Sequence, residues 1–398
     1  MYMYLTNFDV YNSIFSGNYV TNDISGGHGG GIYGDIGGTV INEVDASISA
    51  ARLYVNGNAS ASGDGTSWEQ AFKTLEEAFE HMEHRCSAAE KIWVAAGVYK
   101  PNKIAGNGTT DRDKAFLPPS HIKIYGSFAG TETSLEQRDL SNPANRSILS
   151  GDFNDNDVVT GSGETLSISG NEENASRVVI LMHTTNTVLD GFTIKGGNAI
   201  GSNDIRIGTY TLNNDDGAGI YGYQADARIV NCIFTQNTAA RGGAFFTSEY
   251  SYPVVENCLF LHNIATTNGS ALTTLYNFPI VNCTFWGNRG TGSNTSAVYA
   301  GANYFTMRNS IIYGNNGGFD HNGNGAGLNI TNCLIQGQTP AVDGNIDGNL
   351  DPLFRDPDNG DFRIQSNSPL IDQGDNSYVT TTLDLLGNPR IGNGIVDI

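Results

Sequence analysis

Short apolar runs, each bounded by Asn or Gly, recur along the second half of the chain. The motif Asn-[Cys/Ser]-x-[Phe/Ile] returns with a period of about 25 residues, beginning at Asn231, Asn257, Asn282, Asn309 and Asn332. In all copies but the last, a second Asn follows six residues later, at Asn237, Asn263, Asn288 and Asn315. A small-small-apolar motif keeps the same period, from Ala218, Gly243, Ser270 and Ser296. None of these runs has helical spacing, so each repeat predicts several short strands.

The period and the short strands predict that each repeat forms one coil of a right-handed parallel β-helix. Each coil then places its inward side chains over those of the coil below, about 4.8 Å away. An Asn at a fixed turn position tolerates left-handed backbone geometry and can stack into a hydrogen-bonded ladder. Leucine-rich repeats are disfavoured because their signature is absent, and a β-propeller would need a longer period. The expected fold class is therefore all-β, a solenoid.

Upstream of the regular repeats, the pattern predicts strands over 91–96, 121–125, 177–181 and 187–194. A single segment has helical periodicity: apolar residues fall at spacings of three and four over 67–82, with Ser67 and Gln70 as a capping box at its start. An amphipathic helix placed before the first coils can cover the exposed end of the apolar column and its open strand edge. We therefore expect a capping helix at the N-terminal end of the solenoid.

The chain divides into a displaced coil at 1–45, a linker with a first strand and the capping helix at 46–90, the β-helix at 91–340, and an irregular segment at 341–398. The displaced coil lies before the helix, and its motif positions are Asn12, Ile14, Phe15, Ile32, Tyr33 and Val40. Two interpretations remain open. Either it is the last coil of an upstream β-helix, left by trimming, or it adds strands to a neighbouring molecule. The second would build head-to-tail filaments.

Several segments together resemble a known family. They are 53–79, 91–101, 124–139, 148–155, 188–199, 351–375 and 384–391, and they include "KIWVAAGVYKP", "VLDGFTIKGGNA" and "DPLFRDPDNGDFRIQSNSPLIDQGD". In this set of motifs the chain resembles bacterial secreted choice-of-anchor Q domain proteins, which are similar in fold to pectin lyases and to chlamydial polymorphic outer-membrane proteins. The resemblance implies an extracellular or cell-surface location and fixes no activity.

Composition narrows the classes of partner. The chain has 398 residues, 50 of them Gly, and a net charge of −20. The Gly residues have no three-residue period, which excludes collagen, and 39% hydrophobic residues argue against disorder. The net negative charge disfavours nucleic acid and anionic membrane surfaces as binding partners. The sequence contains no apolar run long enough to cross a bilayer and no visible signal peptide. These two observations fit either a cytosolic protein or a mature or trimmed piece of a secreted one, and the resemblance favours the second.

Four cysteines, Cys232, Cys258, Cys283 and Cys333, share one coil position and should point inward. Stacked neighbours could lie within range of a disulfide bond. A buried thiol is nevertheless a good small core residue, and Ser310 replaces it in one copy, so we expect a reduced ladder. Zinc is disfavoured because no CxxC occurs.

Acidic loops are the candidate metal sites. Residues 152–157 alternate oxygen-bearing side chains as calcium loops do, and 356–361 forms another acidic cluster. Turn chemistry alone explains the same composition. The candidate ligands for a structural Ca²⁺ ion are Asp152, Asn154, Asn156, Asp157, Asp356, Asp358 and Asp361.

Aromatic side chains are the candidate carbohydrate contacts. Rings recur beside the inward position of each coil, and an exposed column of rings could stack on sugar faces. The alternative is that side loops at 200–216 or 247–253 fold over these rings. The candidates are Tyr221, Tyr223, Phe246, Tyr250 and Tyr299.

Catalysis on acidic polysaccharide would need clustered acids with a basic group on one face. The available residues are Asp190, Asp215, Asp216, Lys195 and Arg241, and none of them lies in a known catalytic signature. We therefore expect a non-catalytic surface or structural protein, adhesin-like, whose partners are polysaccharide or copies of itself. A polysaccharide lyase or hydrolase is the alternative.

Overall fold

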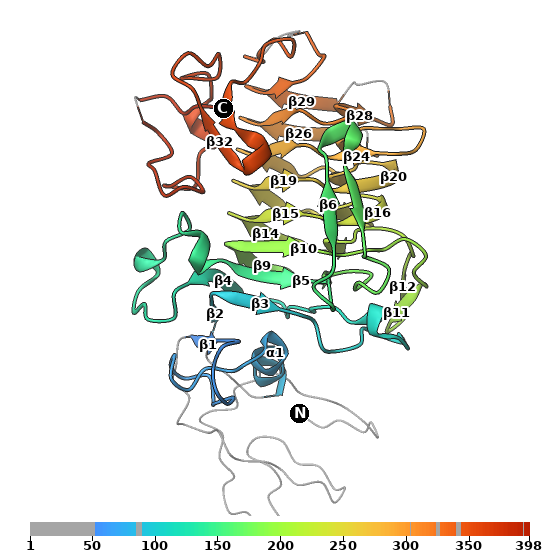
Figure 1. Cartoon of the computed structure of the whole chain (residues 1–398), viewed down its shortest axis with the longest axis vertical. Coiled ribbons are helices and arrows are strands. Elements are labelled where there is room, and N and C mark those ends of the chain that lie inside the picture. Colours follow the sequence, from blue (N-terminus) through green and yellow to red (C-terminus); the bar gives the residue numbers. More distant parts are fainter. Residues whose placement is uncertain (1–51, 85–89, 303, 324–326, 340–343, 393) are drawn as a thin grey trace, which may run out of the picture.

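The computed structural model describes residues 52–84, 90–302, 304–323, 327–339, 344–392 and 394–398. Two parallel sheets run along the described molecule and a third joins them from residue 179 onward, with successive strands of the chain moving from one sheet to the next (Figure 1). Each turn of the chain therefore forms one coil, and the coils stack as the periodicity predicts. Residues 1–45, including every position of the displaced coil, lie outside the described residues, so their assignment stays a prediction.

The strands of the three sheets are short and stack in register. The first sheet contains β1 (Leu53–Val55), β2 (Lys91–Ala95), β4 (Lys123–Phe128), β9 (Thr185–Asp190), β14 (Asp226–Val230), β18 (Val254–Glu256), β22 (Pro279–Val281), β26 (Tyr304–Arg308) and β29 (Gly327–Thr331). The second contains β3 (Gly97–Tyr99), β5 (Ser147–Ser150), β10 (Phe192–Lys195), β15 (Ile233–Thr235), β19 (Leu259–Leu261), β23 (Thr284–Trp286), β27 (Ile311–Tyr313) and β30 (Leu334–Ile335). The third contains β8 (Val179–Met182), β13 (Ile220–Tyr223), β17 (Phe245–Thr247), β21 (Leu272–Thr274), β25 (Val298–Ala300) and β28 (Phe319–His321).

Smaller elements decorate the coils. A fourth, three-stranded sheet joins β16 (Thr238–Arg241), β20 (Ile264–Asn268) and β24 (Arg289–Gly290). Three antiparallel hairpins project from the solenoid: β6–β7 (Val158–Thr160 and Ser167–Ser169), β11–β12 (Ile205–Ile207 and Tyr210–Leu212) and β31–β32 (Phe354–Asp356 and Asp361–Ile364). Among the helices described, none combines the length and apolar character that crossing a bilayer requires.

The core is a column of inward side chains shared by all three sheets. The rings of Phe234, Phe260 and Phe285 stack directly, with centroids 4.6 Å apart at each step. Beside them the four predicted cysteines are buried and free, which confirms the reduced ladder. Burial raises the pKa of the Cys333 thiol to about 12. All four buried cysteines pack as small core residues.

Two asparagine ladders hold the corners of the coils. The first, which we call the corner ladder, comprises Asn231, Asn257, Asn282, Asn309 and Asn332 at the turn from the first to the second sheet, all with positive φ. The second, which we call the inner ladder, comprises Asn237, Asn263, Asn288 and Asn315, and each amide bonds to the next. The predicted hydrogen-bonded stacking is therefore confirmed for the inner ladder and for the Asn231–Asn257 pair of the corner ladder.

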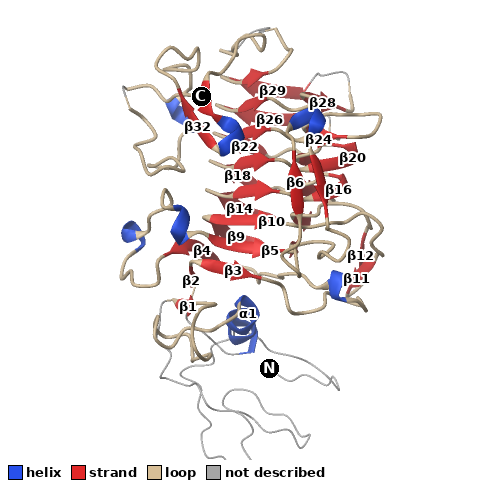
Figure 2. Ribbon diagram, in the orientation of Figure 1, coloured by secondary structure: helices blue, strands red, loops and turns tan. Residues whose placement is uncertain are grey.

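The predicted position of the capping helix at the N-terminal end is confirmed, but its predicted first residue is wrong. Helix α1 (Leu75–His84) covers the N-terminal end of the core with Leu75 and Phe79 (Figure 2). The expected start at Ser67 is wrong because the backbone of Phe72 bridges to β1 instead. Thr74 and Glu77 then form the reciprocal capping bonds, at 2.9 and 3.2 Å.

The expected strand over 187–194 is two strands, β9 and β10. Gly191, with φ of 81°, lies between them at the position that Asn231 occupies in the next coil. The upstream coils therefore turn the same corner with a different residue that tolerates left-handed geometry.

Candidate functional site

The predicted ring column is largely interior. Tyr221, Tyr223 and Phe246 are only 1%, 8% and 0% exposed, because the β11–β12 hairpin packs its apolar side chains over them. The prediction of exposed rings is wrong for these three residues, and the alternative of a covering loop at 200–216 is correct. Tyr299 is partly buried. Tyr221, Tyr223 and Phe246 therefore stabilise the hairpin rather than face a ligand.

Four other tyrosines form an exposed cluster, which we call the tyrosine patch: Tyr250, Tyr252, Tyr276 and Tyr304. The Tyr276 ring centroid lies 5.3 Å from that of Tyr250 and 5.9 Å from that of Tyr252. Tyr250, Tyr252 and Tyr304 are 60%, 50% and 67% exposed. Tyr250, Tyr252 and Tyr276 come from turns between the third and first sheets, and Tyr304 is the first residue of β26 in the next coil, so the four lie at one corner. Of the predicted carbohydrate contacts, Tyr250 alone belongs to this patch.

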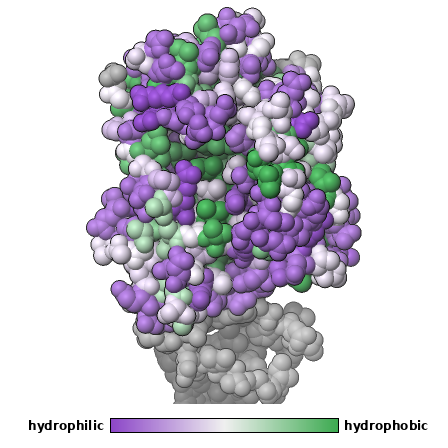
Figure 3. Space-filling view, viewed as in Figure 1, coloured by the Kyte–Doolittle hydropathy of each residue, from purple (hydrophilic) through white to green (hydrophobic). Residues whose placement is uncertain are grey.

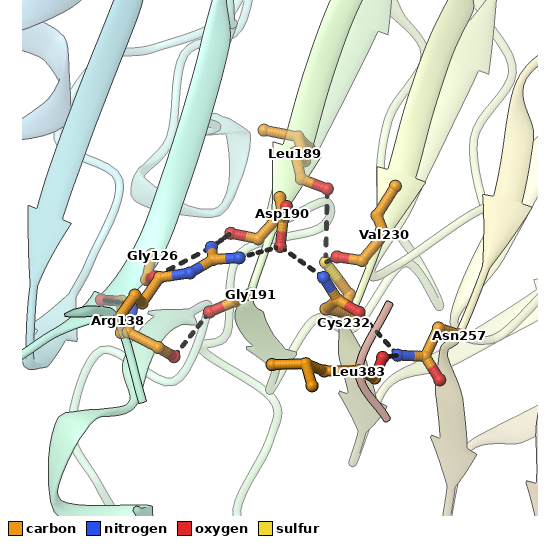
Figure 4. Close-up of polar contacts among 12 residues, drawn as sticks. Gly126, Arg138, Leu189, Asp190, Gly191, Val230, Cys232, Asn257 and Leu383 are labelled. Atoms are coloured by element: carbon orange, nitrogen blue, oxygen red, sulfur yellow. Dashed lines mark hydrogen bonds and ion pairs between the residues drawn. The ribbon is translucent and has the colours of Figure 1, made fainter. Parts of the chain in front are cut away.

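The candidate catalytic residues lie on separate elements. The carboxylate of Asp190, at the end of β9, accepts bonds of 2.9 Å from Arg138 and 2.8 Å from Asn231 (Figure 4). Asp216 instead pairs bidentately with Arg241, at 2.9 and 2.6 Å, beside the third sheet. Asp215 accepts the backbone N–H of Gly201. Each carboxylate is thus held in a structural contact, as buried charges usually are.

The candidate calcium ligands are likewise dispersed. Asp152 is buried, whereas Asn154 and Asn156 are exposed. Asp361 pairs with Arg363, which lowers the pKa of the carboxyl to about 2, and Asp356 accepts a bond from Asn359. Across the described residues, no three His, Cys, Asp or Glu side chains gather as a metal-binding group. Calcium binding, including any through Asp358, stays a prediction.

Asp157 provides a pH-dependent test of the 152–157 loop. Desolvation raises the pKa of its carboxyl from 3.8 to about 6, against two hydrogen bonds from Asn174, with repulsion from Asp152 adding to the rise. The folded chain therefore binds this proton more tightly than the unfolded chain, and stability falls as pH rises from about 4 to about 6.

We expect Asp157→Asn to remove this fall, which amounts to about 1 kcal/mol because the partly exposed carboxylate is screened by solvent. Urea unfolding of both proteins at pH 4.5 and pH 7 measures it. Adding Ca²⁺ at pH 7 is the second arm, since a bound cation would stabilise the charged carboxylate in the wild type alone. Equal pH slopes in the two proteins would contradict the assignment.

A groove runs along the outer face of the second sheet. Its volume is about 380 Å³, and Figure 3 shows an apolar strip in the hollow between polar lobes. The floor contains Ile233, Leu259 and Thr284, which stack in register, and the corner ladder lies at its side. One wall is the 140–146 segment and the other is the C-terminal segment at 384–392. The groove was not predicted, because its second wall comes from irregular sequence.

The C-terminal segment is fastened to the corner ladder by its backbone. We call residues 373–383 the strap. Asn332 donates to the carbonyl of Gln373 at 2.9 Å, and Asn257 donates to that of Leu383 at 3.4 Å. Asn309 makes two bonds to Asp375, donating to its carbonyl at 3.0 Å and accepting its N–H at 2.9 Å. These corner amides therefore hydrogen-bond to backbone groups of the protein's own strap.

The comparison with family models agrees with the fold. A family model described as a right-handed β-helix region matches residues 166–339. A solved structure described as the crystal structure of pectate lyase Pel9A is 14% identical, with a TM-score of 0.38, and the match covers 85% of this chain and 96% of that one. The search of curated proteins returned no match. With the parallel sheets described above, the chain is an all-β, right-handed parallel β-helix, as predicted.

Proposed function

We propose that this β-helix is a non-catalytic, extracellular binding protein of the cell surface that contacts carbohydrate through the tyrosine patch. The observation that supports the proposal is the exposure of Tyr250, Tyr252 and Tyr304 at one corner, where Tyr276 contacts the rings of the first two. Exposed rings offer apolar faces to sugar C–H groups, and their hydroxyls remain available for hydrogen bonds. The rigid solenoid holds these rings in place, so little order is lost on binding.

The hydrogen bonds and ion pairs of the carboxylates beside the groove favour a binding role over a catalytic one. Asp190 is held by Arg138 and Asn231, and Glu256 is held by Arg228 at 2.6 Å. Asp384 accepts two backbone N–H groups of its own turn, both at 2.8 Å. A general acid or base needs a proton-exchanging carboxyl that faces its substrate, and these three are engaged within the protein.

The proposal is tested on an array of bacterial and plant polysaccharides. We expect binding that weakens about thirty-fold in the double variant Tyr250→Ala, Tyr304→Ala, since each ring contributes about 1 kcal/mol. Tyr210→Ala is the matched control, because Tyr210 is exposed on a separate hairpin. Undiminished glycan binding by the double variant would contradict the proposed role of the tyrosine patch in carbohydrate binding. Release of unsaturated or reducing sugar ends would instead establish the lyase or hydrolase alternative.

Head-to-tail assembly through residues 1–45 belongs to the same proposal. In the described part of the chain, β29 ends the first sheet and pairs with β26 alone, which leaves an edge for strand addition. We expect the intact chain to form concentration-dependent oligomers in sedimentation velocity, and a chain lacking 1–45 to remain monomeric. Identical sedimentation of the two proteins would contradict this role.

A further inference from the structure

One member of the corner ladder lacks the partner that the others have. Asn282 is 6% exposed, and neither its side-chain oxygen nor its side-chain nitrogen has a hydrogen-bond partner among the described residues. The strap bonds to Asn309 above it and to Asn257 below it, but not to Asn282. A buried amide without partners is costly and rare in folded proteins. Asn282 lines the groove, so a ligand there could satisfy it.

A second unsatisfied group lines the same groove. The Nε of Arg390 is buried and has no hydrogen-bond partner in the described part of the chain. Burial lowers the pKa of this guanidinium, although nearby carboxylates favour its charge. The carboxylates of Asp384 and Asp397 already accept hydrogen bonds from backbone N–H groups. Within the described ranges the cation therefore has no ion-pair partner, and a carboxylate ligand would supply one in a charge-assisted bond.

The molecule itself indicates which kind of chain the corner amides bind. Asn309 pairs with the N–H and the carbonyl of Asp375, so a peptide backbone satisfies both halves of a corner amide. The apolar residues of the groove floor include the aliphatic Ile233 and Leu259, which lie in register, and Leu386 is 44% exposed on the wall. Aliphatic floors suit apolar side chains, whereas sugars favour aromatic platforms.

We propose that the groove binds an extended peptide segment of a partner protein, with a backbone amide against Asn282 and a carboxylate against Arg390. Alternate apolar side chains of that peptide lie on Ile233 and Leu259, as in other modes in which an extended chain is recognised through its backbone. The site is separate from the tyrosine patch and does not depend on the proposed carbohydrate binding.

The test uses the full chain and an array of N-acetylated octapeptides of alternating Val and Thr that end in Asp or Asn, each with a free or amidated terminus. We expect acid-bearing peptides to bind about tenfold more tightly than their amide counterparts. Arg390→Gln should abolish that difference. Arg355→Gln is the matched control, since Arg355 is an exposed arginine of the same segment outside the groove.

Asn282→Gly separates binding from folding. Glycine keeps the left-handed corner, where φ is 52°, and removes only the unpartnered amide. We expect about tenfold weaker binding of every peptide with an unchanged urea midpoint. The proposal is overturned if no peptide on the array binds, if binding is equal in both groove variants and the wild type, or if uronic-acid oligosaccharides bind in a way that the two variants abolish.

Discussion

Replacing Phe260 by alanine should lower the free energy of unfolding by about 3–5 kcal/mol, the largest effect expected of a single substitution in this chain. The side chain is fully buried, and its ring stacks between Phe234 and Phe285 at 4.6 Å on each side. Both neighbours belong to adjacent coils, so the cavity would interrupt the column that joins them. The close packing of a solenoid core prevents these rings from collapsing into the gap.

Urea unfolding followed by circular dichroism measures this effect. Phe260→Leu is the first control and should cost less than half as much, because most of the volume remains. Leu261→Ala is the second control, since Leu261 is the next residue of β19, faces outward and is partly exposed. If Leu261→Ala destabilised the protein as much as Phe260→Ala, the stacked column would not be the main source of stability.

Sequence periodicity predicts the elements of this fold that repeat. Residues equivalent to Asn263 and Cys258 recur in most of the regular coils and are buried there in similar environments, so one pattern determines many contacts. The burial of the cysteines follows from the inward direction that they share with the Phe column, and Ser310 at the same position pointed to a reduced ladder. The predicted start of α1 at Ser67 was wrong because Phe72 pairs with β1. This is a contact between two segments, and a local sequence pattern does not encode it.

The sites are harder to predict, because they depend on segments that break the repeat. Tyr221 and Phe246 point away from the core, as the pattern indicates, and are nevertheless buried, because the β11–β12 hairpin covers them. Arg177 lies beneath the same hairpin, fully buried and 5.0 Å from the Tyr221 ring, and nothing in its local sequence signals this. The groove similarly requires the C-terminal segment to fold back over the second sheet.

Irregular segments therefore decide which repeated positions become functional. Every corner Asn has the same backbone geometry, yet Asn332 and Asn309 bind the strap while Asn282 does not. The tyrosine patch has a comparable origin, since three of its four rings come from turns between strands and none comes from the repeated motif. The repeated coils form a regular surface, and the hairpins and the C-terminal segment that pack on it determine which part remains accessible.

The inner ladder leads to the second large effect. Asn263→Ala should destabilise the protein by about 3 kcal/mol, because it leaves several buried groups without partners. Its nitrogen donates to the carbonyl of Phe234 and to the oxygen of Asn288, and its oxygen accepts the backbone N–H of Asn237. Urea unfolding, compared with that of the wild type, measures the loss.

Asn282→Gly is the informative comparison, because Asn263 and Asn282 are both buried asparagines at corners of the same solenoid. Burial and residue type alone predict similar losses. Hydrogen-bond satisfaction predicts opposite behaviour, since Asn263 has partners on both sides and Asn282 has none among the described residues. A loss of about 3 kcal/mol for Asn263→Ala beside little change for Asn282→Gly would attribute ladder stability to satisfied amides. Similar losses for both would mean that the corners are stabilised by packing alone.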